Sequence, residues 1–353
     1  MSINTVTDLQ LDANIVFLRG DLDVTSDDDL RFVSVVETAK TLLEKGAYKL
    51  IIAGHKGRPE GQPNEEDSLQ FLVPSLQESL GQEVFFVPYE MMESFSRQEL
   101  YDSRIKVYLL ENLRFWSGEK ANDPQFVQTL AGSMANVYVN EAFASSHREH
   151  ASIVGLPEKI RENGGTAVVG LRFAQELETL SQTLDSSSSP SILILSGVKK
   201  DKIDYLEKLE SKFDKILIAG RLPEYLGDLE KDVNTYVVKG RDKLVVANLN
   251  QDKEDITLGS VEAFMPIIES AKTIVVSGPM GKYEEEGQRN GTQKVFDAIK
   301  ESTAYKVAFG GDTENALKFF NVSDSFDWIS VGGGASLEFL STGTLPGIEA
   351  LLG

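Results

Sequence analysis

Residues 14–53 of the chain, NIVFLRGDLDVTSDDDLRFVSVVETAKTLLEKGAYKLIIA, contain a strand pattern, a helix pattern and a second strand pattern in that order. The two outer runs, Asn14–Leu18 and Leu50–Ala53, are almost continuously apolar, which is typical of strands buried on both faces of a parallel sheet. Between them, in Leu30–Lys45, apolar side chains recur at steps of three and four residues and predict an amphipathic helix. The stretch therefore predicts a strand–helix–strand unit of the α/β class.

The same alternation continues along the rest of the chain. Further apolar runs of strand length, separated by amphipathic stretches, occupy Val84–Val87, Val107–Leu110, Val137–Val139, Ile192–Leu195, Ile216–Ala219, Leu244–Ala247, Ile274–Val276 and Val307–Phe309. Repeated β-then-α order predicts doubly wound parallel sheets, in which ligands bind at the carboxyl ends of the strands. With 353 residues, the chain has the length of two such domains.

Turn and linker signals in the middle of the chain predict where the first domain ends. Asn163-Gly164-Gly165 is a turn signal, a helical pattern follows at Leu171–Leu184, and the polar run Asp185–Pro190 comes next. We therefore expect a first domain over residues 1–165, a connecting helix and linker over residues 166–190, and a second domain from residue 191.

The composition excludes several classes of protein. Lys and Arg number 35 against 55 Asp and Glu, and the net charge of −20 disfavours nucleic acid and anionic membranes as partners. There are no cysteines, which removes disulfides, thiolate metal sites and cysteine nucleophiles. No apolar run approaches the roughly 18 residues of a membrane span, and the first residues lack the pattern of a secretion signal. We therefore expect a cytoplasmic protein.

Arginine and histidine side chains recur just after the predicted strands of the first domain. Because the carboxyl ends of parallel strands meet at one edge of a sheet, we expect these side chains to face one cleft. Guanidinium groups bind carboxylates and phosphates through paired hydrogen bonds, so the pattern predicts an anionic ligand. For any single arginine, the alternative is a surface ion pair. The residues concerned are Arg31, Arg58, Arg114 and Arg148, with His55, His147 and His150.

Two pairs of residues in this region allow other interpretations. His147 and His150 have the spacing of a zinc pair, but Arg148 between them repels a cation and no third protein ligand is evident. Asp21 and Asp23 could form a carboxylate pair for acid–base chemistry. We favour a role in which they accept hydrogen bonds from substrate hydroxyls or orient the arginines.

Glycine-rich turns follow the predicted strands of the second domain. They lie at Ser196–Lys202, Ser277–Glu284, Gly310–Thr313 and Gly332–Ser336. Such turns direct backbone N–H groups and a helix dipole at one position, which suits phosphate. One such turn usually only reverses the chain, but four turns with two lysines nearby favour a polyphosphate site. The Walker and dinucleotide-binding signatures are absent, so phosphoryl transfer is favoured over a Walker-type NTPase or a dehydrogenase.

Taken together, the motifs of both halves resemble those of one enzyme family. The chain resembles phosphoglycerate kinase along nearly its whole length. This resemblance implies two Rossmann-like domains joined by a hinge helix, with hinge closure before transfer. It also implies that the second domain ends at residue 340 and that residues 341–353 return to the first domain. The segments that carry the resemblance are Arg19–Val24, Gly54–Pro59, Leu109–Phe115, Val139–Ser152, Gly278–Gly281 with Glu284, Gly310–Thr313, Gly332–Phe339 and Leu345–Gly347.

The resemblance also implies roles for individual residues. It implies that the first domain binds 3-phosphoglycerate or 1,3-bisphosphoglycerate through Asp21, Asp23, Arg31, His55, Arg58, Arg114 and Arg148. It implies that the second domain binds ADP or ATP with Mg²⁺ through Lys199, Lys202, Gly220, Ser277, Glu284, Gly310, Gly311, Asp312 and Thr313. In the family pattern Glu284 matches the ribose contact, and Asp312 lies near a magnesium ion held mostly by nucleotide phosphates. The groups expected to surround the transferring phosphoryl group are Arg31, Lys199 and the N–H groups around Gly310 and Gly333.

Four departures from the family pattern lie in the second domain. The turn Ser196–Lys202 is one residue shorter than in the family, and Ala219–Pro223 replaces a triple glycine that approaches adenine. The segment 225–255 is shorter than in the family and lacks a helix. Ser277 and Val331 replace an Asn and a Thr of the family. The predicted function is reversible phosphoryl transfer between 1,3-bisphosphoglycerate and ADP. The alternative is a non-catalytic or weakly active relative that binds a phosphorylated metabolite, because the departures cluster around the nucleotide base. Nothing in the sequence suggests an obligate interface, so we expect a monomer.

Overall fold

The chain folds into two compact units. The computed structural model describes residues 3–12, 14–92, 103–132, 135–185, 189–227 and 229–352. Unit 1 runs to Leu177 and also takes the residues from Thr344 onward, whereas unit 2 comprises Glu178–Gly343. None of the helices in the described ranges is long and apolar enough to cross a membrane.

Unit 1 is built on a six-stranded sheet in the order β3-β4-β2-β1-β5-β6, in which every neighbouring pair is parallel. The central strands are buried along their whole length, which explains their continuous runs of Val, Ile and Leu. The strands are β1 (Ile15–Arg19), β2 (Lys49–Ala53), β3 (Val84–Val87), β4 (Val107–Leu110), β5 (Val137–Asn140) and β6 (Thr166–Val169).

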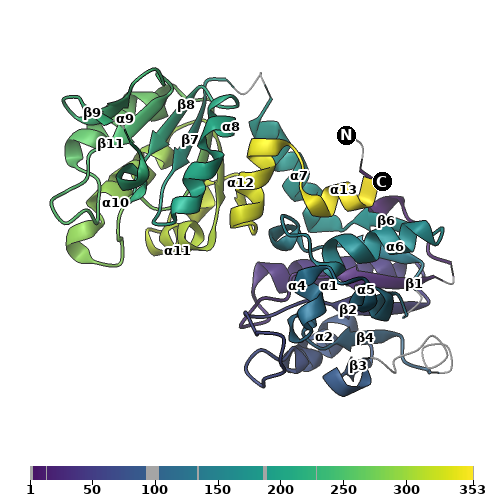
Figure 1. Cartoon of the computed structure of the whole chain (residues 1–353). Coiled ribbons are helices and arrows are strands. Elements are labelled where there is room, and N and C mark those ends of the chain that lie inside the picture. The colour runs from purple at the N-terminus through teal and green to yellow at the C-terminus, as the bar shows by residue number, and fades with distance from the viewer. Residues whose placement is uncertain are drawn as a thin grey trace. The chain divides into compact units, whose positions relative to one another are not determined.

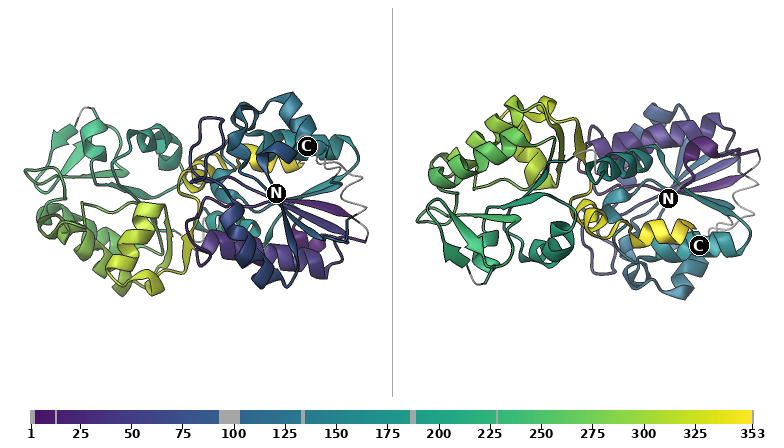
Figure 2. Two further views of the ribbon diagram at one scale, coloured as in Figure 1. Left: turned by 90° about the horizontal axis from the view of Figure 1, so that it is seen from below. Right: turned by 90° about the horizontal axis from the view of Figure 1, so that it is seen from above.

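Helices cover both faces of this sheet. The apolar faces of α1 and α2 pack on one face of the sheet through buried residues such as Phe32, Val35 and Leu76. Figure 2 shows α5, α6 and the yellow C-terminal helix α13 on the opposite face. The helices are α1 (Leu30–Glu44), α2 (Val73–Leu80), α4 (Ser117–Ala121), α5 (Pro124–Ala131), α6 (Leu156–Glu162), α7 (Leu171–Thr183) and α13 (Pro346–Leu352). The shorter turns are η1 (Val6–Asp8), η2 (Gln70–Leu72), η3 (Tyr89–Met91), η4 (Leu113–Phe115), η5 (Phe143–Ser145) and η6 (Ala151–Gly155).

Unit 2 contains an eight-stranded sheet in the order β14-β13-β12-β7-β8-β11-β10-β9. Figure 1 labels β7, β8, β9 and β11 of this sheet. Its first six strands are parallel, while β10 pairs antiparallel with both β11 and β9. The strands are β7 (Ser191–Leu195), β8 (Lys215–Ile218), β9 (Leu229–Lys231), β10 (Thr235–Val238), β11 (Leu244–Ala247), β12 (Thr273–Ser277), β13 (Tyr305–Phe309) and β14 (Trp328–Ser330).

The helices of unit 2 enclose a second core. Residues of α9, α10 and α11 pack with the strands in one apolar cluster that includes Phe264, Phe296 and Leu317. Helix α8 contacts α12. The helices are α8 (Leu206–Glu210), α9 (Leu258–Ser270), α10 (Asn290–Glu301), α11 (Gly311–Phe319) and α12 (Gly333–Thr342), with shorter turns η8 (Lys200–Tyr205), η9 (Leu222–Tyr225), η10 (Glu286–Gln288) and η11 (Ser323–Ser325).

The structure confirms the α/β class and all ten predicted strands to within one or two residues at each end. It also contains four strands that the apolar pattern did not indicate, β6, β9, β10 and β14. Strand β6 pairs with β5, so the range 166–190, expected to be a connecting helix and linker, begins with a strand of unit 1. The division between the units falls inside α7, later than residue 165. Residues 186–188 of the expected linker lie outside the described residues.

The segment from residue 225 to residue 255 departs from the doubly wound pattern. Its described residues form no helix, as predicted, but contain β9 and β10, which pair as an antiparallel ribbon at the edge of the sheet. The sheet of unit 2 is therefore parallel over six strands, as expected for a doubly wound domain, and carries an antiparallel ribbon at one edge. Short, largely exposed strands such as Leu229–Lys231 show no apolar run, because an edge strand does not have to be buried on both faces.

Candidate functional site

A cluster of basic side chains lies at the carboxyl edge of the sheet of unit 1. Arg19 is the last residue of β1, His55 follows β2, and Arg114 lies in η4 directly after β4. Arg148 follows η5, which itself follows β5. Strand ends in parallel sheets converge in this way. The charges of Arg19, Arg114 and Arg148 all act on the His55 imidazole, as expected if the four side chains are close neighbours.

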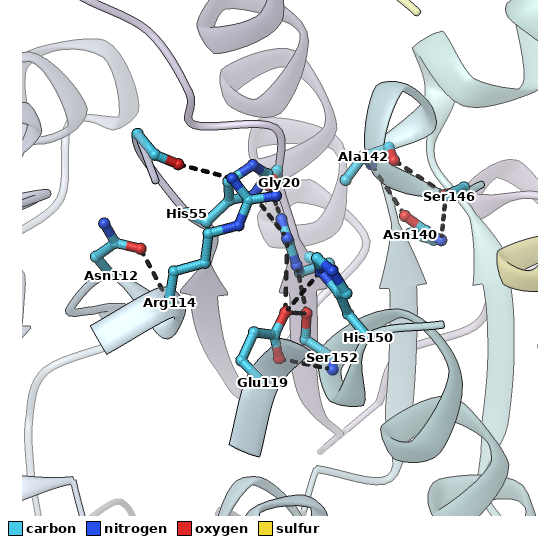
Figure 3. A network of polar contacts seen from close by, with 12 residues as sticks. Gly20, His55, Asn112, Arg114, Glu119, Asn140, Ala142, Ser146, His150 and Ser152 are labelled. Atoms are coloured by element: carbon cyan, nitrogen blue, oxygen red, sulfur yellow. Dashed lines mark hydrogen bonds and ion pairs between the residues drawn. The ribbon is translucent and has the colours of Figure 1, made fainter. Parts of the chain in front are cut away.

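Arg19 is fully buried within this cluster. Figure 3 shows three of its neighbours, His55, Glu119 and Ser152. Arg19 Nε donates to the Ser152 hydroxyl at 2.7 Å, and Arg19 Nη2 donates to Nδ1 of His55 at 2.9 Å. A third bond runs from Nη1 to the Gly20 carbonyl. The fully buried Glu119 carboxylate accepts from the Ser152 hydroxyl at 2.6 Å and lies 4.0 Å from the guanidinium. Arg19 is therefore a fixed internal charge.

Arg114 is also buried, and within the described parts of the chain no carboxylate lies at ion-pair distance from it. Its Nη1 donates to the Gly57 carbonyl at 2.7 Å, while its Nε has no hydrogen-bond partner among the described residues. Burial and the neighbouring guanidinium groups of Arg148 and Arg19 lower the pKa of Arg114 to about 10. A buried cation that is destabilised by other cations is stabilised when an anion binds beside it.

Two carboxylates and a further arginine complete the edge. The Asp23 carboxylate accepts from the Gly57 N–H at 2.9 Å and so orients the loop after β2. Asp21 is buried with one oxygen unpartnered, and burial raises the pKa of its carboxyl although Arg31 and Arg19 oppose that rise. Arg31 makes a two-pronged bond to Asp29, the N-cap of α1, with Nε–Oδ1 3.0 Å and Nη2–Oδ2 2.8 Å. That pairing fixes the Arg31 guanidinium near Asp21.

Arg58 and Arg148 form the more accessible part of the basic cluster. Arg58 is exposed and Arg148 is partly buried. Burial and the charge of Arg58 lower the pKa of Arg148, while Asp23 and Asp21 raise it. Within the described residues no carboxylate lies within ion-pair distance of Arg58, Arg114 or Arg148. The geometry thus provides a partly buried anion site whose guanidinium groups have no ion-pair partner among the described residues.

The histidines of unit 1 are held neutral. Burial and neighbouring arginines lower the pKa of His147 to about 4 and that of His150 to about 3. Burial, together with the charges of Arg19 and Arg114, also lowers the pKa of His55 well below its usual value. Neutral rings avoid adding further positive charge to the cluster. They can still donate one N–H each to an anion.

Acid sensitivity of unit 1 follows from the buried His150. The unfolded chain takes up a proton at this imidazole below about pH 6.5, but the folded chain does so only near pH 3, where the pKa of His150 lies. Stability is therefore lost as pH falls from about 6.5 toward 3. We expect His150→Gln to reduce the stability difference between pH 7.5 and pH 4.5 by roughly 2 kcal/mol, measured by urea unfolding. Equal pH dependence in both proteins would contradict this.

In unit 2, three turns after parallel strands lie backbone against backbone. A Cβ on Gly278 would lie 2.3 Å from the Ser196 carbonyl oxygen, and one on Gly220 would lie 2.5 Å from the Gly197 N–H nitrogen. Gly278 and Gly220 have φ values of 105° and 59°. Glycine is therefore required here, because no side chain fits between the turns. The close approach leaves the strand ends free of side-chain bulk.

Two helix N-termini meet beside these turns. Gly310 precedes α11 and Gly332 precedes α12, and neither helix start has a side-chain cap. A Cβ on Gly333 would lie 3.1 Å from the Gly310 Cα, so the first turns of the two helices are adjacent. Uncapped first-turn N–H groups and two helix dipoles directed at one region suit a phosphate group. Lys199 and Asp312 are exposed in the same unit. Burial lowers the pKa of Lys202, while the charge of Asp312 raises this pKa and the charge of Lys199 lowers it.

Three of the residues expected to bind nucleotide are used inside the protein. The Lys202 ammonium donates to the Ser196 carbonyl at 2.6 Å and to the Ser277 carbonyl and hydroxyl at 3.0 Å each. All three of its N–H bonds are thus satisfied by the ends of β7 and β12. The Thr313 hydroxyl donates to the Phe309 carbonyl and accepts from the Gly278 N–H. Because Ser277 and Thr313 are almost inaccessible to solvent, their polar groups bond within the protein.

The two lysines of the first glycine turn should therefore respond differently to replacement. We expect Lys202→Met to lower the free energy of unfolding by about 2–3 kcal/mol, because three buried acceptors lose their donor. Lys199→Met is the matched control, and because this side chain is exposed we expect a change below about 0.5 kcal/mol. Urea unfolding of the full chain measures both. Equal stability of the two variants would show that the Lys202 bonds are not made.

The segment Ala219–Pro223, which replaces the family's triple glycine, also has a defined arrangement. The Arg221 N–H donates to the Gly197 carbonyl at 2.9 Å, and its side chain pairs with Glu224 at 2.6 Å. Lys253 joins the same carboxylate at 3.1 Å. Glu284, the expected ribose contact, is exposed on the turn after β12.

Comparisons with known proteins give the same family from sequence and from structure. The family model described as phosphoglycerate kinase matches residues 6–227 and 228–343. The chain is a member of the phosphoglycerate kinase family. Curated phosphoglycerate kinases from Akkermansia muciniphila and Thermosipho africanus are 34% and 35% identical over 397 and 398 aligned positions, with 98% of this chain and 97% of each relative covered.

Solved structures of phosphoglycerate kinases have a similar fold. The structure from Coxiella burnetii superposes with a TM-score of 0.78 at 26% identity, covering 99% of both chains. The one from Pyrococcus horikoshii has a TM-score of 0.74 at 25% identity, covering 98% of this chain and 97% of that chain. The sequence alignments are longer than the 353 residues of this chain, so the curated phosphoglycerate kinases carry segments that it lacks.

Compared with the residues expected from the phosphoglycerate kinase resemblance, the structure adds a buried layer behind the arginines. Arg19, Glu119, His150 and Ser152 belong to one network, in which Glu119 lies outside the quoted motifs and Arg19 and Ser152 were given no role from the sequence. Ser152 lies 133 positions from Arg19, which no local pattern reveals. The signal that could have found Arg19 is its position as a charged last residue of a continuously apolar strand.

Proposed function

We propose that this chain is an active phosphoglycerate kinase that transfers a phosphoryl group reversibly between 1,3-bisphosphoglycerate and ADP, giving 3-phosphoglycerate and ATP. The observation that carries the proposal is the uncompensated arginine cluster of unit 1. Several guanidinium groups without carboxylate partners are costly in a chain of net charge −20 unless an anionic ligand neutralises them. Family membership supplies the identity of that ligand as a triose acid phosphate.

On the acid-phosphate side, the residues divide into two roles. Arg58, Arg114 and Arg148 bind the anionic groups of 3-phosphoglycerate through charge-assisted hydrogen bonds. Asp21, Asp23 and His55 lie around the same region and accept from or donate to the hydroxyl and carboxylate groups. Arg31 is oriented by its two hydrogen bonds to Asp29, and its guanidinium stabilises the negative charge of the transferring phosphoryl group.

On the nucleotide side, the backbone performs most of the binding. The free N–H groups at the starts of α11 and α12, around Gly310, Gly311 and Gly333, bind phosphate oxygens. Exposed Lys199 supplies a mobile positive charge. Gly220, Ser277, Lys202 and Thr313 act indirectly, because they fix the turns that shape this site.

The donor set of unit 2 fits a magnesium ion that arrives with the nucleotide. Within the described ranges no three acidic, histidine or cysteine side chains gather into a metal site of their own. Magnesium typically binds through one or two carboxylates together with substrate phosphates and water, and the exposed Asp312 in the first turn of α11 provides one carboxylate. When bound, the ion neutralises charge on the nucleotide phosphates.

Catalysis in this scheme needs positioning and preorganised positive charge. Phosphoryl transfer proceeds in line and spreads negative charge over three equatorial oxygens, so little covalent chemistry is required of the protein. The arginines and the helix N-termini are already oriented by internal hydrogen bonds, and their orientation costs little during the reaction. A non-catalytic metabolite-binding relative is not favoured, since the anion sites of both units are retained.

Coupled turnover tests the proposal directly. With 3-phosphoglycerate, Mg-ATP and a coupling dehydrogenase, we expect steady oxidation of NADH that depends on all three components. Calorimetric titration of ADP, GDP and ATP then defines the base preference, which the altered Ala219–Pro223 segment leaves open. Binding of 3-phosphoglycerate without turnover on any purine nucleotide would instead support the metabolite-binding alternative. Light scattering tests the predicted monomer.

A further inference from the structure

The buried pair Arg19–His55 has a role that goes beyond binding the anion by charge. We propose that Arg19 fixes His55 in the tautomer that carries its proton on Nε2, so that this N–H donates to the triose ligand. In this proposal Glu119 and Ser152 are positioning residues that hold Arg19. The donor role rests on the proposed function, whereas the tautomer itself is a property of the free protein.

The direction of one hydrogen bond determines the tautomer. A guanidinium group has donors only, so the Arg19 Nη2–His55 Nδ1 contact of 2.9 Å requires an unprotonated Nδ1. A neutral imidazole has a single N–H, which must then be on Nε2. His55 cannot present an acceptor to the ligand in this state. It can only donate, which requires an acceptor oxygen on the ligand.

The surroundings keep the ring neutral. The charged and titratable groups that face His55 are Arg19 from β1, Arg114 from η4, Arg148 after η5 and His150 at the start of η6. Burial contributes most to the low pKa of His55, and the three guanidinium groups and His150 lower it further. Protonation of Nδ1 would also break the bond from Arg19. The imidazole is therefore a neutral donor over the physiological pH range.

Arg19 is held by hydrogen bonds from each of its three nitrogens. The Ser152 hydroxyl accepts a hydrogen bond from Arg19 Nε at 2.7 Å and donates one to Glu119 Oε1 at 2.6 Å. The Ser152 N–H donates to the other Glu119 oxygen at 3.0 Å, which fixes the carboxylate in turn. Glu119 also balances the charge of Arg19 inside the protein. A buried guanidinium anchored in this way cannot rotate away from Nδ1.

The first experiment needs only the wild-type protein. Long-range ¹H–¹⁵N correlation spectra of the ¹⁵N-labelled chain distinguish protonated from unprotonated imidazole nitrogens. The chain has only three histidines, and His147→Gln and His150→Gln variants assign them. We expect His55 to show a protonated Nε2 and an unprotonated Nδ1 at pH 7, and to keep this pattern at pH 5.5. A protonated Nδ1, or a doubly protonated ring, would overturn the proposal.

The second experiment removes the buried charges that fix the tautomer of His55. In Arg19→Met/Glu119→Gln both buried charges are lost together, and we expect a protonated Nδ1 population and roughly tenfold weaker binding of 3-phosphoglycerate by calorimetry. KM for 3-phosphoglycerate should rise by a similar factor while kcat changes less than about threefold, as for uniform binding. An unchanged His55 spectrum with unchanged affinity would contradict the proposal.

A matched serine pair keeps the test valid if the double variant does not fold. Ser152→Ala loosens Arg19, and we expect an intermediate shift of the His55 nitrogen signals and about threefold weaker binding. Ser146 is an equally buried serine of unit 1 that bonds Asn140 and Ala142 instead, so Ser146→Ala should leave both readouts unchanged. Equal responses of the two variants would overturn the proposal.

Different outcomes distinguish a failure of the proposed function from a failure of the proposed His55 tautomer. A wild-type protein with the Nε2–H tautomer that does not bind 3-phosphoglycerate would refute the proposed function while the proposed tautomer remains. A protein that binds and turns over 3-phosphoglycerate with the opposite tautomer would refute the proposed tautomer alone.

Discussion

Replacement of Arg31 by alanine is expected to lower kcat for phosphoryl transfer by about a hundredfold to a thousandfold. Arg31 is the arginine of unit 1 whose guanidinium is held by a two-pronged bond to Asp29 while 29% of its side chain stays exposed. A preoriented, partly exposed cation stabilises charge that develops in the transition state more than charge already present in the substrate. KM for 3-phosphoglycerate should therefore rise less than about tenfold.

The experiment on Arg31 has a matched control within the same unit. Arg104 is exposed and lies before β4, so Arg104→Ala makes the same change in net charge without touching the cluster. We expect its kcat to stay within about twofold of the parent value. Asp29→Asn, which retains an N-cap for α1, should give an intermediate loss. A kcat for Arg31→Ala within threefold of the parent would remove Arg31 from the transition-state role.

Gly278→Ala is expected to destabilise unit 2 by about 4 kcal/mol and to abolish measurable nucleotide binding at millimolar concentrations. The added Cβ would lie 2.3 Å from the Ser196 carbonyl oxygen and 3.0 Å from the Gly197 nitrogen. Both contacts are with backbone, which cannot move aside as a flexible side chain can. The φ of 105° adds strain for any residue with a Cβ.

A second glycine separates the two causes of this effect. Gly240 also has a positive φ, 76°, but a Cβ there would meet nothing within 4 Å. Gly240→Ala should therefore cost only about 1 kcal/mol and leave nucleotide binding intact. Urea unfolding and ADP calorimetry on both variants provide the comparison. Similar losses in the two proteins would show that backbone strain, and not the packing of the turns after β7 and β12, explains the effect of Gly278→Ala.

Much of the fold could be predicted because the central strands are buried on both faces. Runs such as Leu50–Ala53 and Ile274–Val276 are apolar throughout, and a local pattern is enough to find them. Strand β6 was missed because the Gly164-Gly165 turn directly before it was interpreted as a domain boundary. The strands β9, β10 and β14 were not indicated because they are short and partly exposed, so their apolar residues form at most a brief run between polar neighbours.

The site was only partly predictable for a similar reason. Topology brings strand ends together, so the approach of Arg114, Arg148 and His55 follows from their places in the sequence. The internal roles of Lys202 and Thr313 do not follow from sequence, because they depend on bonds to residues 75 and 35 positions away. A lysine beside a glycine turn has the same sequence pattern whether its ammonium is exposed or buried.

The central claim is that the anion sites of the two units serve one reaction. ³¹P NMR of the wild-type protein with 3-phosphoglycerate and Mg-ATP, in the presence of hydroxylamine to trap the acyl phosphate, tests it most directly. The account predicts that ADP and inorganic phosphate form only when 3-phosphoglycerate is present, with one 3-phosphoglyceryl hydroxamate for each ATP consumed. ATP that stays intact, or that is hydrolysed equally well without 3-phosphoglycerate, would contradict it.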